Sequence, residues 1–118
     1  MPTMKKSLAA PDETRKFDKG EVEVLTLGDV TFGRATFQPG WKWSECVKPI
    51  AGTDSCQVHH NTFVQSGQMH VVMDDGSETD LRAGDLAVIP PGHDAWIVGN
   101  EACIAFDFSP DFQKYAKG

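Results

Sequence analysis

The chain has 118 residues, of which 40% are hydrophobic and 24% are charged, as expected for one globular domain. Its net charge of −6 excludes the basic surface that binding to a nucleic-acid backbone requires. No apolar run approaches the roughly 20 residues of a membrane-spanning helix, so neither nucleic acid nor a membrane is an expected partner. The start of the chain lacks the apolar core of a secretory signal, and the three cysteines form no CxxC pair. These features favour a reduced, cytoplasmic setting.

The beginning of the chain predicts no regular structure. Residues 1–19 are polar, contain two prolines and show no hydrophobic periodicity, so we expect a loose N-terminal arm. The folded domain then occupies residues 20–118. Its first two predicted strands, 22–27 and 30–37, end at turn-forming Gly-Asp and Pro-Gly pairs.

Short strands separated by turn residues continue along the chain. Further strands are predicted over residues 56–58, 62–65, 69–73, 86–89, 96–98 and 102–108. Residues 41–44 are interpreted as extended and residues 49–55 as a loop. A helical turn is expected only over residues 111–116, after a proline. Many short strands at turn-rich spacing indicate a β-sandwich or a β-barrel.

One motif narrows this fold class. The segment from Gly84 to Trp96 reads GDLAVIPPGHDAW, and it resembles the second motif of cupins in its Gly, Pro and Gly positions. Between Phe37 and Phe108, the wider string PGWKWSE…CQVHH…VQSG…MHVVMDDG is similar to a cupin subgroup. Members of that subgroup occur alone or beside other modules, some of them cyclase-like signalling domains. The resemblance implies an all-β fold: a single jelly-roll (cupin) β-barrel with a loose N-terminal arm and a short C-terminal turn. It also implies a homodimer that makes contact through the arm or an outer sheet.

The resemblance further implies where metal ligands would lie. Cupins use three histidines and one glutamate, and counting along the two motifs places these positions at Asp54, Cys56, His60 and Ala95. A cysteine thiolate and a neutral histidine are competent ligands, and an aspartate oxygen can join them. Ala95 offers no ligand atom. His93 lies two residues earlier on the same strand face, so we expect it to replace the missing histidine.

Cys56 and His60 also constrain the backbone between them. On a straight strand their Cα atoms would lie ~13 Å apart, which is too far for one metal ion. The resemblance therefore implies a bend around Val58-His59. Because the set contains sulfur, zinc is the favoured metal, with iron or manganese as alternatives. Cys56 is alternatively a small buried hydrophobe, and His60 is alternatively a hydrogen-bonded structural histidine or a base.

Other side chains are candidates for contacts with an organic ligand. Small barrels bind ligands in an open mouth lined by apolar walls and a few polar groups. The candidate ligand-binding residues are Trp43, Asp94 and Trp96, with Asp94 alternatively orienting an imidazole. We expect His59 and His70 to face away from the barrel interior and to be structural.

Three functions are compatible with this pattern. The leading one is a small-molecule-binding cupin with a divalent metal held by Cys56, His60 and His93 in the barrel mouth. The second is a non-catalytic sensor or regulatory module that binds its ligand without metal. The third is a metal-free isomerase or epimerase that uses His60 or His93 as a general base.

Overall fold

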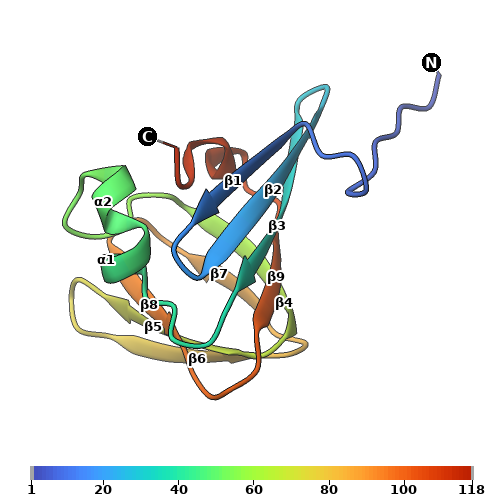
Figure 1. Ribbon diagram of the computed structural model, residues 1–118. Coiled ribbons are helices and arrows are strands. Elements are labelled where there is room, and N and C mark those ends of the chain that lie inside the picture. The colour runs from blue at the N-terminus through green and yellow to red at the C-terminus, as the bar shows by residue number, and fades with distance from the viewer. Residues whose placement is uncertain (1, 118) are drawn as a thin grey trace.

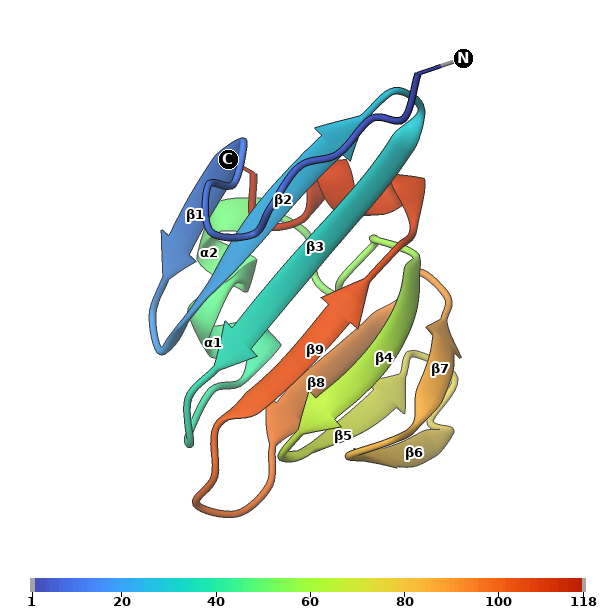
Figure 2. The same cartoon turned by 90° about the vertical axis from the view of Figure 1, so that its right-hand side faces the viewer.

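The computed structural model describes residues 2–117 and contains two antiparallel sheets. The larger sheet has six strands in the order β1-β2-β3-β9-β4-β7, and the smaller has three in the order β6-β5-β8. Figure 2 shows the six strands side by side with the smaller sheet behind them. The predicted all-β fold is confirmed, in the form of two facing sheets that are not joined into a closed barrel.

The strands and helices have the following bounds. The strands are β1 (Glu13–Phe17), β2 (Gly20–Leu27), β3 (Val30–Phe37), β4 (His60–Ser66), β5 (Gln68–Met73), β6 (Glu78–Arg82), β7 (Leu86–Ile89), β8 (His93–Ile97) and β9 (Cys103–Asp107). The helices are α1 (Trp43–Cys46), α2 (Lys48–Ala51) and the 3₁₀ helix η1 (Pro110–Lys114). No described helix is both long and apolar enough to cross a membrane.

Strand β1 lies within the segment that we expected to be a loose arm. It pairs with β2 along its whole length, from Glu13 opposite Val24 to Phe17 opposite Gly20. Of its five residues only Arg15 is buried, so the sequence shows no apolar alternation. Backbone pairing at a sheet edge therefore defines this strand. In Figure 1 the chain before β1 extends away from the body of the molecule.

Two other elements differ from the sequence expectation. Residues 43–44, interpreted as extended chain, lie in α1, and residues 49–51, interpreted as part of a loop, lie in α2. Gly52 ends α2 with a left-handed φ of 73°. Strand β6 was not predicted, because Leu81 is its only buried residue. The predicted helical turn near the C-terminus is confirmed as η1.

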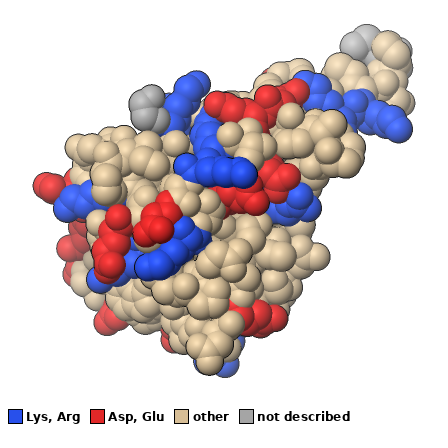
Figure 3. Space-filling view, in the orientation of Figure 1, with Lys and Arg blue, Asp and Glu red and all other residues tan. Residues whose placement is uncertain are grey.

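The hydrophobic core lies between the two sheets. Strands β3, β4, β8 and β9 each send every second residue inward. Phe112 of η1 packs against this core over Gly33, where an added Cβ would overlap the aromatic ring. The C-terminal segment is thereby fixed against the inner face of β3. On the face seen in Figure 3, side chains of both charge signs are interspersed.

Candidate metal centre

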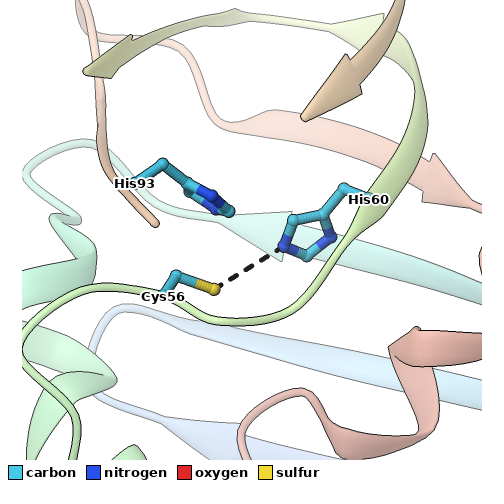
Figure 4. A group of neighbouring side chains, drawn as sticks. All are labelled: Cys56, His60 and His93. Carbon is cyan, nitrogen blue, oxygen red and sulfur yellow. Dashed lines mark hydrogen bonds between the residues drawn. The ribbon is translucent and has the colours of Figure 1, made fainter. Parts of the chain in front are cut away.

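Cys56, His60 and His93 converge at one buried point between the sheets. Their ligand atoms all lie within 4.8 Å of one another. Cys56 follows α2 in an irregular connection, His60 is the first residue of β4, and His93 is the first residue of β8. Figure 4 shows the three side chains pointing toward a common centre. The structure thus brings together the three residues that the sequence singled out as a metal-binding set.

Backbone hydrogen bonds fix Cys56 beside His93. The Cys56 amide donates to the His93 carbonyl at 2.7 Å, and the Gly92 amide donates to the Cys56 carbonyl at 2.7 Å. A strand was predicted over residues 56–58, but the structure forms only this isolated antiparallel bridge at Cys56. Gly92 has a φ of 94°, so a residue with a side chain would be strained at this bend. The Pro-Pro-Gly segment therefore follows the end of β7 and positions His93 beside Cys56.

The chain bends between Cys56 and His60, as the family resemblance implied. The Cys56 Sγ lies 3.8 Å from the His60 Nε2, although four residues of a straight strand would separate their Cα atoms by ~13 Å. The bend is held from outside, because the His59 amide donates to the Asp111 carboxylate at 2.8 Å. A residue far along the chain thus stabilises a bend that lacks good turn formers.

Hydrogen bonds also orient both imidazole rings. The His60 Nδ1 lies 2.5 Å from the Asp107 Oδ2, and the His93 Nδ1 lies 2.8 Å from the Pro90 carbonyl oxygen. A carbonyl oxygen and a carboxylate accept, so each Nδ1 carries the hydrogen and each Nε2 keeps a lone pair. This tautomer is the one that a metal-binding histidine needs, with its other nitrogen held by an oxygen acceptor.

Burial determines the protonation of two members of the group. It raises the pKa of the Cys56 thiol to about 12. Burial, and then the proximity of His60, lowers the pKa of His93 to about 4. At neutral pH the metal-free protein therefore holds a thiol and a neutral His93. A metal ion that binds the sulfur must displace the thiol proton, so its affinity would rise with pH.

Two cavities adjoin this group. The inner cavity has a volume of about 40 Å³, which is room for about three water molecules. Its walls are mainly apolar: Ala35, Phe37, Trp41, Trp43, Met69, Ile89, Ala95, Ala105, Phe112 and Tyr115, together with His60, Thr62, His93 and Asp107. The outer pocket has a volume of about 240 Å³ and is lined by Trp43, Val47, Ala51, Thr53, Cys56, Gln57, Val58, Lys114, Tyr115, Ala116 and Lys117. Trp43 and Tyr115 belong to both walls.

The other predicted ligand residues are divided between these cavities and the surface. Trp43 lines both cavities. Asp94 and Trp96 line neither, since they alternate with the inward-facing residues of β8. The Asp94 carboxylate instead accepts from the Ser44 amide at 3.1 Å, which ties α1 to β8. The ammonium of Lys42 lies 5.2 Å from the centre of the Trp96 ring.

Four further positions that the sequence analysis discussed lie outside the group of Cys56, His60 and His93. Asp54 does not join the group, because its carboxylate is fully exposed and lies 3.8 Å from the Lys48 ammonium. Ala95 faces the inner cavity, where the cupin pattern would place a ligand histidine. His59 and His70 are also outside the group. His70 lies on the outer side of the small sheet, between the carboxylates of Asp80 at 2.6 Å and Glu78 at 2.7 Å.

Asp107 and Tyr115 contribute to the site but were not predicted. Asp107 is 2% exposed and also accepts from the Ser109 amide at 2.9 Å and the Thr62 hydroxyl at 3.3 Å. Asp107 could have been recognised in the sequence, because it is a carboxylate at a position that alternates with residues 103 and 105, which face inward on the strand. Tyr115 follows η1 and is 3% exposed. Nothing in the local sequence pattern distinguished it from a surface residue.

Comparison with known proteins places this geometry in context. A model of the EutQ-like cupin domain matches residues 47–104, which include all three converging side chains. Among solved structures, a protein of unknown function from Rhizobium leguminosarum is 21% identical, with a TM-score of 0.59 over 93% of this chain and 99% of that one. No curated protein matches the sequence.

Two further solved structures are also similar to this chain. A cupin-like protein from Thermotoga maritima is 16% identical, with a TM-score of 0.57 over 89% of this chain and 77% of that one. A putative ethanolamine utilization protein Q from Salmonella typhimurium is 15% identical, with a TM-score of 0.54 over 78% of this chain and 70% of that one. At these identities the similarity establishes the fold.

Proposed function

We propose that this chain, which belongs to the cupin superfamily, is a small-molecule-binding protein with one divalent metal ion held by Cys56, His60 and His93. The observation that carries the proposal is the orientation of the two rings. Each Nδ1 is engaged by an oxygen acceptor, which leaves each Nε2 available in a buried site that also contains a thiol. Hydrophobic packing alone does not require this arrangement of polar atoms.

The residues present fit a zinc ion best. Bonds of about 2.0–2.1 Å to nitrogen and about 2.3 Å to sulfur place the atoms of a tetrahedral set with one sulfur roughly 3.3–3.6 Å apart. The Cys56 and His60 atoms are already 3.8 Å apart, and all three ligand atoms lie within 4.8 Å. A set of two nitrogens and one sulfur favours zinc over iron or manganese. Three protein ligands leave a fourth position open, which is typical of zinc sites that bind a substrate or water.

The residues around the three ligands orient them, balance the charge of the metal ion and limit the access of water. Asp107 and the Pro90 carbonyl orient the His60 and His93 rings so that each Nε2 faces the metal position. The thiolate of Cys56 supplies the negative charge that compensates a buried cation. The apolar wall of the inner cavity limits access of bulk water. When bound, the metal would supply Lewis acidity toward an oxygen atom of the ligand or lower the pKa of a bound water.

Metal analysis tests the proposal directly. Protein purified without a histidine tag is stripped with chelator, supplied with zinc, iron or manganese, and analysed by plasma mass spectrometry. We expect one zinc per chain in the wild type and no stoichiometric zinc in Cys56→Ser or His93→Gln. Cys103→Ser is the matched control, since Cys103 is also buried and free but lies outside the group. Absence of stoichiometric metal in the wild type would contradict the proposal.

The pairing of His60 with Asp107 favours one second function. A carboxylate that holds Nδ1 leaves Nε2 as a proton acceptor facing the cavity, as in a metal-free isomerase or epimerase. Turnover that survives chelator and disappears in His60→Gln would support this function over the metal-dependent one. Turnover that chelator abolishes and zinc restores would exclude it.

We also propose a homodimer that forms through an exposed apolar patch on the larger sheet. The patch comprises the exposed Phe63, Leu86 and Val88 and the half-buried Phe106. Leu86 and Val88 on the edge strand β7 are 68% and 65% exposed, and Phe63 pairs with both Leu86 and Phe106 across the sheet. A contiguous apolar surface of this kind typically marks a protein contact. Light scattering should give a dimer for the wild type and a monomer for Leu86→Lys/Val88→Lys. A monomeric wild type would contradict the proposal.

A further inference from the structure

The outer pocket is the larger of the two spaces beside the metal group. It opens between helices α1 and α2 on one side and the C-terminal residues 114–117 on the other, which are the green helices and the red segment of Figure 1. Its volume of about 240 Å³ compares with about 40 Å³ for the inner cavity. The inner cavity holds about three water molecules, so an organic molecule of ring size fits only in the outer pocket.

The walls of the outer pocket combine cations with apolar surface. Lys114 and Lys117 provide positive charge, and none of the described residues that line the pocket is Asp or Glu. The Lys114 ammonium is paired with the Asp111 carboxylate at 3.1 Å, and its side chain is 77% exposed. To contact a ligand it would exchange this exposed ion pair, which contributes little stability, for the ligand's carboxylate. The opposite wall contains Trp43, Val47 and Val58. Asp111 pairs with Lys114 and Glu13 lies near Lys117, but neither carboxylate lines the pocket.

The outer pocket also shares its inner wall with the metal group. Cys56 lines the pocket, and Trp43 and Tyr115 separate it from the inner cavity. Tyr115 belongs to the C-terminal segment, whose position is fixed by a hydrogen bond of 2.7 Å from the Arg15 guanidinium to the Tyr115 carbonyl. A molecule bound in the outer pocket would therefore lie directly against the layer that covers the three converging side chains.

We infer that the outer pocket binds an organic monoanion with an apolar body, such as an aromatic carboxylate. Its carboxylate would face Lys114 and Lys117, and its body would pack on Trp43, Val47 and Val58. Each ammonium about 4 Å from a carboxylate in water contributes roughly a fivefold gain in affinity. The role of this molecule as a substrate rests on the proposed metal function, whereas its binding to the pocket does not.

Benzoate is a suitable probe, with benzamide as its uncharged counterpart. Both are titrated into ¹⁵N-labelled protein, with and without zinc, while the indole N–H signals are followed by NMR. We expect benzoate to shift the Trp43 signal but not that of Trp96, which lies outside the pocket. Benzamide should bind roughly 25-fold more weakly, because it lacks the charge that the two lysines recognise, each worth about fivefold.

A pair of charge reversals makes the test specific. Lys114→Glu/Lys117→Glu should weaken benzoate binding roughly 25-fold or more and leave benzamide binding unchanged. Lys5→Glu/Arg82→Glu is the control, because it alters the net charge equally at residues that do not line the pocket. Equal loss in both double variants, or equal affinity for benzoate and benzamide, would overturn the inference. Zinc binding without benzoate binding would overturn this inference alone, and benzoate binding without zinc binding would overturn the metal function alone.

Discussion

His93 and His70 lie on neighbouring strands of the small sheet, but their side chains face opposite sides of it. His93 on β8 is 3% exposed, and burial followed by the proximity of His60 lowers its pKa to about 4. His70 on β5 is held between Asp80 and Glu78, whose hydrogen bonds raise its pKa. Strand alternation thus gives the same residue type two opposite environments. The inner histidine stays neutral and can bind a metal, whereas the outer histidine is stabilised as a cation.

Asp107 is the residue on which the inner environment depends most. Asp107→Ala leaves the His60 Nδ1–H, the Ser109 amide and the Thr62 hydroxyl without their buried acceptor. We expect a loss of about 3–5 kcal/mol in the free energy of unfolding and a roughly 10- to 100-fold loss of zinc affinity. Urea denaturation and zinc titration measure the two effects. Asp107→Asn keeps one acceptor oxygen and should lose less stability, so equal losses in the two variants would contradict this role.

The lowered pKa of His93 predicts a stability profile for the metal-free protein. Below pH 6.5, the unfolded-state pKa of His93, this side chain binds a proton in the unfolded chain but remains neutral in the folded chain. The contribution of His93 to the free energy of unfolding should therefore be fully present above pH 6.5 and be lost progressively as the pH falls to about 4. The shift corresponds to about 3 kcal/mol. Urea denaturation across this range should show the slope in the wild type and a flatter profile in His93→Gln. An unchanged slope in the variant would assign the effect to other groups.

The sequence predicted the three converging residues, Cys56, His60 and His93, better than it predicted the residues and strands around them. Cys56, His60 and His93 occupy positions set by glycines and prolines that can be counted along the chain. Asp107 reaches His60 only because β9 pairs with β4, and strand pairing at long range leaves little local signal. Strands β1 and β6 were missed for a related reason, since each buries one side chain and is defined by its partner strand. The exclusion of Asp94 and Trp96 from both cavities follows from strand alternation once β8 is known to begin at His93.

The outer histidine should produce the smallest effect, and it should have the opposite sign. His70 gains charge-stabilising partners on folding, which raises its pKa above the unfolded value. Its contribution is therefore present below pH 6.5 and is lost as the pH rises through the folded-state pKa. Because the cluster is solvent-exposed, we expect about 0.2–1 kcal/mol, reduced further at 0.5 M salt by screening. His70→Gln should remove this decline with rising pH, whereas His93→Gln should remove the decline with falling pH. If both variants altered the profile in the same direction, the two histidines would not differ in environment as the structure indicates.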